Sequence, residues 1–515
     1  MRRDDSLRPV PQGCSGGPWP TRFGTVRATR SGLSHRQYQH SSSTMKALAI
    51  VLLLAWSGSV IDPATPLAQE LQPSTWQAKY RSGRIDALKR QLASGMASTD
   101  AFWREVAAEG TPLVEPAESG DKHQILTFVW RGAEDTRNVL VVMNPFTLFA
   151  PRDYLMTRLV GTDVWYLTVR VPRGARFTYQ LSPDDPMAGP TPSAASVRAN
   201  AQGDPLNPRR WSCGPDASLT QCSSIVELPD AMPQPWITPR GGTKPARLES
   251  HRFKSDILKN ERDVWVYVPS GYRSEGEPCA LLVLFDGRAY STLVPTPTIL
   301  DNLIAASMIP STIAVLVGDS ERGRELVPNP ALADSIAKEL VPWIRTQYHV
   351  SADPRRMIIG GSSAGGFVAI YTALHHPEVF GNVLGQSPAA FRSPELARYF
   401  AERAPASVPG NRDRHDLEEL LDRGLAETTG WLANEVIDRP KMPLRFYLDA
   451  GLFEVDFTGF AIGILESTRY LRDVLRAKGY DVRYQMFVGG HEYVNWRGTL
   501  ADGLIALLGT DRAAK

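Results

Sequence analysis

Residues 356–371 read RMIIGGSSAGGFVAIY, and this stretch decides the fold. A run that suits a buried strand leads into GSSAG at residues 361–365, and a run that suits a helix follows. The motif G-x-S-x-G often occurs by chance, and a strand-to-helix loop without chemistry is the alternative. Between a strand and a helix, however, it has the order of a nucleophile elbow, which lifts a serine hydroxyl to the helix N-terminus. The pattern predicts Ser363 as a nucleophile on an α/β-hydrolase domain.

Apolar runs on both sides of this elbow alternate with helical patterns. The runs expected to form strands are residues 264–268, 280–285, 313–317, 357–359, 383–384, 444–448 and 482–488. Helices are expected over 331–348 and 367–375. Apolar strands separated by helices indicate a mostly parallel sheet that is covered on both faces. We therefore expect an α/β-hydrolase catalytic domain over residues 250–512.

A different pattern precedes this domain. Short runs rich in Val, Tyr, Trp and Thr occur at residues 125–130, 139–143, 164–171 and 177–181. Turn signals between them predict a small, Ig-like β-sandwich domain over 111–228. A helical lead-in is expected within 69–110, where Ile85, Leu88, Leu92 and Met96 share one face. The Pro- and Gly-rich segment 229–249 is typical of a linker.

The serine needs a general base, which on this fold follows it in the sequence. Four of the nine histidines do so. His375 and His376 end the helix after the elbow, where a histidine usually caps the helix. His415 lies in a charged run. His491 remains, in the flexible turn GGHE after the last apolar run, and it is the predicted base.

The catalytic acid is expected where the preceding strand runs into DAGLFE at residues 449–454. Glu454 is preferred, because it lies beyond Gly451 on the loop and has the longer arm to reach His491. Asp449 directly follows the strand and is the alternative acid, although it could instead cap the turn. A Ser-His dyad without an acid is the third possibility.

An oxyanion hole requires two backbone N–H groups aimed at the developing negative charge. Ala364, directly after the nucleophile, is expected to supply the first. The second is expected from the tight turn at residues 284–288, and Arg288 is chosen over Gly287.

Charge and cysteine content limit the partners. The 57 Lys and Arg residues nearly balance the 55 Asp and Glu residues, for a net charge of +2. No large field of one sign results, so we expect no nucleic-acid partner. No CxxC or Cys/His cluster suggests a metal site, and no cofactor is expected. The expected partner is a small-molecule ester.

The N-terminal region predicts export. Residues 1–44 are rich in Arg, Ser, Gly and Pro and are expected to be a disordered, non-native extension. Met45 and a lysine then precede a ten-residue apolar run and small residues up to Ala68. This pattern is typical of a signal peptide over 45–68 and is too short to span a bilayer. We expect a periplasmic or secreted enzyme without stable membrane association after cleavage, with a cytoplasmic location as the alternative.

Cys213 and Cys222 bracket a short loop. They could form a disulfide in an oxidising compartment, although spacing alone does not establish the pairing. Cys14 lies in the predicted extension, and Cys279 opens an apolar strand.

Several segments together resemble the enterochelin (enterobactin) esterases, a family that hydrolyses ferric catecholate siderophores. They are DPLNP at 204–208, FDG at 285–287 with Tyr290, REL at 324–326 with Asn329, the elbow, and GGH at 489–491 with Trp496 and Arg497. The resemblance covers roughly residues 100–510. It implies a sandwich domain that helps to cap the site, and a hydrolase domain that cuts the siderophore trilactone through an acyl-enzyme and releases iron.

The resemblance also implies that Arg288, Arg324 and Trp496 face an anionic, aromatic ligand, because guanidinium groups pair with catecholate oxygens and stack on rings. Ordinary salt bridging and packing are the alternative roles of these residues. Alternative activities on the same fold are a feruloyl or acetyl esterase acting on polysaccharide and an acyltransferase. A ligand-binding protein without catalysis is disfavoured by the intact Ser363 and His491.

Overall fold

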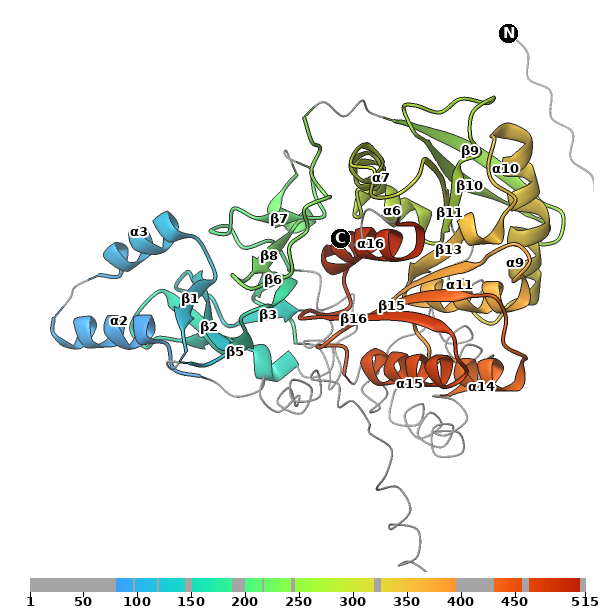
Figure 1. Ribbon diagram of the computed structural model, residues 1–515. Helices are drawn as coiled ribbons and strands as arrows, with labels where there is room; N and C mark the ends of the chain where they lie inside the picture. Colours follow the sequence, from blue (N-terminus) through green and yellow to red (C-terminus); the bar gives the residue numbers. More distant parts are fainter. Residues whose placement is uncertain are drawn as a thin grey trace, which may run out of the picture. The chain divides into compact units, whose positions relative to one another are not determined.

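The computed structural model describes part of the chain, in ten segments. They are residues 80–95, 98–117, 120–143, 151–187, 200–214, 217–241, 246–318, 326–394, 430–455 and 463–509. The predicted extension, the predicted signal peptide, Met96, Arg324 and His415 lie outside the described residues. The described segments form one large sheet with helices around it and two smaller sheets (Figure 1).

The large sheet contains eight strands in the order β16-β15-β14-β13-β11-β12-β10-β9. Their bounds are β9 (Arg247–Ser255), β10 (Asn260–Val268), β11 (Ala280–Leu284), β12 (Thr312–Val317), β13 (Met357–Ser362), β14 (Asn382–Gln386), β15 (Arg445–Gly451) and β16 (Asp481–Phe487). The six strands from β11 to β16 pair in parallel, and β9 and β10 add an antiparallel edge. The predicted mostly parallel sheet of an α/β-hydrolase is confirmed.

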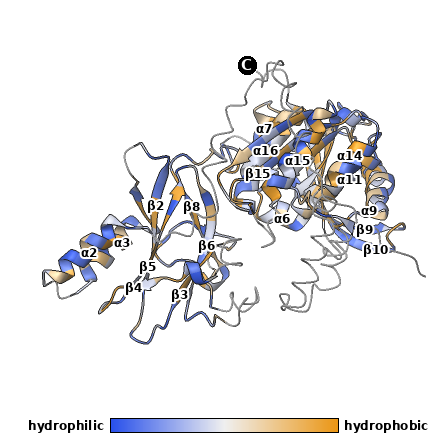
Figure 2. Ribbon diagram, turned by 90° about the horizontal axis from the view of Figure 1, so that it is seen from below, coloured by the Kyte–Doolittle hydropathy of each residue, from blue (hydrophilic) through white to orange (hydrophobic). Residues whose placement is uncertain are grey.

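Helices cover both faces of this sheet, because successive side chains of a strand point to opposite faces. One core cluster joins Leu281 and Val283 to α9 (Pro330–Asp334), α10 (Val341–Gln347), α11 (Ala364–His375), α14 (Trp431–Asp438) and α15 (Ile464–Ala477). The other joins Leu282 and Leu284 to α6 (Gly287–Thr292), α7 (Thr296–Ala305) and α16 (Tyr493–Leu508). The helices labelled around the sheet contain both hydrophobic and hydrophilic residues (Figure 2). Burial on both faces explains why the strands are continuous apolar runs.

The N-terminal part is a β-sandwich of two four-stranded sheets, ordered β1-β2-β5-β4 and β3-β6-β8-β7. Their strands are β1 (Leu113–Pro116), β2 (His123–Arg131), β3 (Val139–Met143), β4 (Thr157–Arg158), β5 (Val164–Pro172), β6 (Arg176–Pro183), β7 (Arg210–Trp211) and β8 (Ser223–Glu227). Phe128 of one sheet and Tyr179 of the other stack edge to face, with ring centroids 4.8 Å apart, inside their common core. The four predicted strand runs correspond to β2, β3, β5 and β6.

The segment DPLNP stabilises the sandwich internally. The Tyr179 hydroxyl donates to Asp204 Oδ2 at 2.8 Å, and Asn207 Nδ2 donates to the same hydroxyl at 3.2 Å. Asp204 is 1% exposed, and burial raises the pKa of its carboxyl. This segment therefore fixes the loop after β6 against β8, and its contacts are structural.

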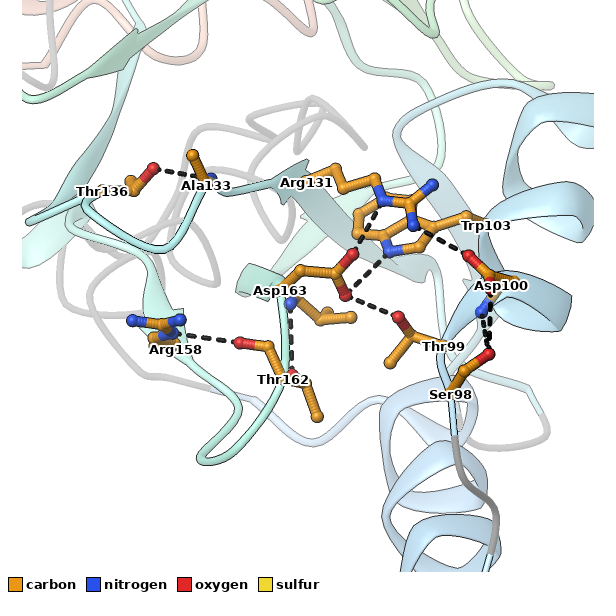
Figure 3. Close-up of polar contacts among 11 residues, drawn as sticks. Ser98, Thr99, Asp100, Trp103, Arg131, Ala133, Thr136, Arg158, Thr162 and Asp163 are labelled. Atoms are coloured by element: carbon orange, nitrogen blue, oxygen red, sulfur yellow. Dashed lines mark hydrogen bonds and ion pairs between the residues drawn. The ribbon is translucent and has the colours of Figure 1, made fainter.

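The helical lead-in consists of two helices, α2 (Gly83–Ala93) and α3 (Asp100–Glu109). Asp163 links α3 to the sandwich (Figure 3). Its Oδ1 accepts from Thr99 Oγ1 at 2.5 Å and from Trp103 Nε1 at 3.1 Å, and its Oδ2 accepts from Arg131 Nε at 2.7 Å. One carboxylate thus connects the start of α3 with β2.

Asp163→Ala is expected to lower the free energy of unfolding by about 2 kcal/mol, because it leaves three donors without their charged acceptor. Urea denaturation monitored by fluorescence measures the shift. Glu134→Ala is the control, since that side chain is exposed. Equal midpoints for the two variants would contradict the structural role of Asp163.

No helix in the described segments is long and apolar enough to cross a membrane.

Candidate active site

Ser363 occupies the sharp turn between β13 and α11. Its backbone has φ 55° and ψ −121°, a conformation that L-residues rarely adopt and that is typical of a strained functional turn. Neighbouring glycines make room for the turn. A Cβ on Gly361 would lie 2.8 Å from the carbonyl carbon of Gly365, and one on Gly365 would lie 3.0 Å from Asp286 Oδ2. The sequence therefore folds locally into the elbow that its pattern predicts.

His491 and Glu454 are brought together from two loops. His491 Nδ1 lies 2.7 Å from Glu454 Oε1. The Glu454 side chain is fully buried, and its Oε2 accepts from the backbone N–H of Gly451 at 2.6 Å. A carboxylate against Nδ1 favours the tautomer that is protonated there, which leaves Nε2 as the basic nitrogen.

Asp449 makes different contacts. It lies on β15, and its Oδ1 accepts from the backbone N–H of Ser387 at 2.8 Å. Complete burial raises the pKa of its carboxyl from 3.8 to about 8. A carboxyl that is mostly neutral at pH 7 provides little charge to stabilise an imidazolium, so the geometry favours Glu454 as the acid.

Asp449→Asn is expected to change the pH dependence of stability. The pKa of Asp449 is raised in the folded state, so the stabilisation from its neutral form is complete below about pH 4 and is lost as the pH rises through 8. The asparagine variant avoids this loss, at most about 1.4 kcal/mol per pH unit. In denaturant titrations at pH 5, 7 and 9, the free energy of unfolding of the variant should rise relative to that of the wild type as the pH increases. A constant difference would refute the buried, neutral carboxyl.

Two helix N-termini flank the elbow. Ala364 begins α11, and Gly287 and Arg288 begin α6 after the left-handed Asp286. The first N–H groups of a helix have no partner within the helix. Only glycine fits at position 287, because a Cβ there would lie 2.5 Å from the carbonyl carbon of Leu316. The three residues predicted for the oxyanion hole thus come from two turns that meet at Asp286 and Gly365.

A cavity of about 850 Å³ opens beside the second of these turns. Trp211 to Gly214 of the sandwich form one side, and Asp286, Arg288, Trp265 and Tyr493 are among the hydrolase residues that line it. Arg288 forms no ion pair with any of the described carboxylates, and its side chain is exposed. Arg497 lies against Trp211, with its guanidinium carbon 4.9 Å from the ring centroid.

Of the three residues expected to face a ligand, only Arg288 lines this cavity, and Arg324 lies outside the described residues. Trp496 is placed differently, with 3% exposure. Its ring meets His491 edge to face at 4.8 Å, and its Nε1 donates to Ser387 Oγ at 3.0 Å. We therefore assign Trp496 to the support of His491. The reason is that α16, which starts two residues after His491, turns this indole inward.

Sequence reasoning missed Trp211 and Tyr493 as cavity residues and Glu492 as a contact of the histidine loop. For Trp211, the only signal in the sequence was the nearby Cys213, a candidate for a disulfide. Cys213 and Cys222 form a disulfide with an S–S distance of 2.11 Å, which answers the pairing that spacing left open. The bond ties the cavity segment to the residue that precedes β8.

Within the described residues, no group of three or more His, Cys, Asp or Glu side chains is arranged to hold a metal ion. The site presents a serine, a histidine paired with a carboxylate, and the first backbone N–H groups of two helices. That combination suits acyl transfer from an ester.

Two family models match the chain. Putative esterase matches residues 255–507, and Enterochelin esterase, N-terminal, matches residues 125–237. An iron(III) enterobactin esterase of Yersinia enterocolitica is 30% identical over 307 residues, covering 54% of this chain and 85% of the relative. One of Dickeya dadantii is 29% identical and covers 82% of this chain and 95% of its own.

Solved structures of similar proteins indicate the same family. A ferric enterobactin esterase from Salmonella typhimurium is 26% identical, with a TM-score of 0.60, and covers 79% of this chain and 98% of its own. The enterobactin esterase from Shigella flexneri, solved in the presence of enterobactin, is 26% identical, with a TM-score of 0.58. Its match covers 80% of this chain and 98% of the Shigella chain. Both domains are thus matched by relatives of one kind. The chain belongs to the enterochelin (enterobactin) esterase family and is a carboxylic ester hydrolase.

Proposed function

We propose that this protein hydrolyses the ester bonds of an enterobactin-like catecholate siderophore through Ser363, His491 and Glu454. The contact of His491 Nδ1 with Glu454 Oε1 at 2.7 Å carries the catalytic part of the proposal. The substrate part is supported by relatives that are named iron(III) enterobactin esterase and iron(III) salmochelin esterase.

In the proposed reaction, Ser363 Oγ attacks an ester carbonyl while His491 Nε2 takes the hydroxyl proton. The backbone N–H groups of Ala364 and of Arg288 or Gly287 stabilise the negative oxygen of the tetrahedral intermediate. His491 then gives its proton to the leaving alkoxide, and an acyl-enzyme remains. Water, deprotonated by the same histidine, attacks the acyl carbonyl, and His491 returns the proton to Ser363 Oγ as the carboxylic acid leaves.

Glu454 would hold the imidazole in the required orientation and stabilise its charged form. Cutting the trilactone separates the catecholate arms, so the iron loses ligands that are held together at high effective concentration. Release of iron is therefore the expected consequence of ester hydrolysis.

The cavity beside Arg288 suits an aromatic, anionic group. Its volume of about 850 Å³ is in the range of small-molecule sites. Trp211 and Trp265 offer apolar ring surface, and Arg288 offers a guanidinium without a carboxylate partner among the described residues. Guanidinium groups pair with phenolate oxygens and stack on rings, as a catecholate arm requires.

Incubation of the purified protein with ferric enterobactin, iron-free enterobactin, and a panel of aryl, feruloyl and acetyl esters tests the function. We expect the highest kcat/KM for one of the trilactones, with linear products seen by mass spectrometry. Preference for feruloyl or acetyl polysaccharide esters would reject the siderophore assignment. An added alcohol acceptor that is converted into a new ester would indicate acyl transfer in place of hydrolysis.

We also propose that the enzyme is exported and processed near Ala68. The basic start, apolar run and small residues at 45–68 suit the secretory machinery, and the Cys213–Cys222 disulfide suits an oxidising compartment. We expect mass spectrometry of the native protein to find an N-terminus close to residue 69 and the two cysteines oxidised. A cytoplasmic enzyme that retains Met45 would refute export.

A further inference from the structure

The loops that carry His491 and Glu454 are joined to the sandwich domain. The N–H of Arg176 in β6 donates to the carbonyl of Val488 at 2.9 Å, three residues before His491. A Cβ on Gly489 would lie 2.7 Å from the carbonyl oxygen of Arg176, so the two backbones touch. The histidine loop therefore lies against the first residue of β6.

The acid loop has the same neighbour. Leu452 and Phe453, just before Glu454, belong to the hydrophobic cluster of the sandwich core together with Phe177. The N–H of Phe453 donates to the carbonyl of Gly489 at 3.0 Å, which links the acid loop to the histidine loop. Both loops thus depend on the sandwich for their packing.

Glu492, directly after His491, makes a polar contact with Thr178 of the sandwich domain. Its Oε2 accepts from the backbone N–H of Thr178 at 2.9 Å, and its Oε1 accepts from the Thr178 hydroxyl. The carboxyl is buried, and desolvation raises its pKa to about 7. Burying a carboxyl is unfavourable unless its oxygens find donors, and Thr178 of β6 supplies two of them.

We propose that the sandwich domain positions the catalytic histidine, with Glu492 and Thr178 as positioning residues that fix the His491 loop to β6. This proposal rests on the proposed role of His491. It gives the N-terminal domain a part in catalysis that is separate from binding the substrate. The physical reason is that GGHE is a flexible turn, and the contacts from β6 hold it where the imidazole meets Glu454.

The test compares two matched pairs of variants. Thr178→Val removes the hydroxyl and keeps the shape, whereas Thr178→Ser keeps the hydroxyl. Glu492→Ala removes both acceptors, whereas Glu492→Gln can still accept from and donate to Thr178. With an aryl ester, we expect the first member of each pair to lose roughly 10- to 100-fold in kcat with KM within about twofold, since small displacements of a catalytic group have effects of this size. The Ser and Gln variants should recover most of the loss.

Asp163→Ala serves as the control for general destabilisation of the sandwich, because its contacts join α3 to β2 and it should keep the wild-type kcat. A second measurement follows His491 directly. The strongly deshielded proton resonance of the hydrogen bond between Nδ1 and Glu454 should be present in the wild type and weakened in Glu492→Ala and Thr178→Val.

Wild-type kcat in Thr178→Val and Glu492→Ala would overturn the proposal. It would also be overturned if these variants lose kcat but Asp163→Ala loses just as much. An unchanged proton resonance would do the same. Hydrolysis of aryl esters without any action on ferric enterobactin would instead reject the siderophore assignment and leave this inference standing. If no ester is hydrolysed, the resonance alone decides whether β6 positions His491.

Discussion

Ser363→Ala is expected to lower kcat for ester hydrolysis by about 10⁴-fold or more, because no other group replaces the attacking oxygen. The protein should stay folded. The backbone N–H of Ser363 donates to the carbonyl of Gln386 at 2.9 Å, and its carbonyl accepts from the N–H of Phe367 at 3.0 Å, so the turn does not depend on the hydroxyl. Steady-state kinetics and circular dichroism of the purified variant measure both effects.

His491→Ala should lose as much as Ser363→Ala, since the two groups act in one proton transfer. The double variant should then be no slower than either single variant. A double variant that is far slower would mean that the two residues contribute independently. Normal turnover in Ser363→Ala would reject the mechanism altogether.

The sheet of the hydrolase domain could be predicted because most of its strands are buried on both faces. β11, and β12 from Ile313 onward, are apolar without interruption, and both strands are completely buried, which leaves a clear signal in the sequence. β9 gave no such signal. It is an edge strand with the sequence RLESHRFKS, and only Phe253 and Ser255 are buried in it. Its start also lies inside the segment that composition predicts as a linker.

Within the site, the residues that could be predicted belong to local motifs. The elbow and the GGHE turn contain their own signal, because the chemistry requires small residues next to the reactive one. Trp211 and Glu492 acquire their contacts only in the folded chain. Glu492 meets Thr178 across 314 positions of sequence, and no periodicity within either segment indicates that pairing.

Trp496 shows the limit of a family resemblance. The resemblance implies that this residue faces the ligand, whereas its side chain is 3% exposed and does not line the cavity. The direction of its side chain, however, depends on the start of α16. There the backbone N–H of Trp496 donates to the carbonyl of Glu492, and the indole ring packs between His491 and Tyr493. A residue next to the histidine can therefore pack against the catalytic group without lining the cavity.

Glu454→Gln is expected to lower kcat by about 10⁴-fold, because the amide keeps the shape but removes the charge that stabilises the His491 imidazolium. The amide can also place its NH₂ group against Nδ1, which favours the tautomer that is protonated on Nε2 and cannot accept the serine proton. KM should change little, since the Glu454 side chain is fully buried and lies behind the histidine.

Asp449→Asn is the matched comparison. At pH 7 the Asp449 carboxyl, with a pKa of about 8, is mostly neutral already, so an amide in its place removes little charge. Its kcat should stay within about tenfold of the wild type, far above that of Glu454→Gln. Steady-state kinetics of both variants on one aryl ester, at constant pH, make the comparison. If Asp449→Asn loses more than Glu454→Gln, Asp449 is the acid, and if both lose little, the enzyme works as a Ser-His dyad.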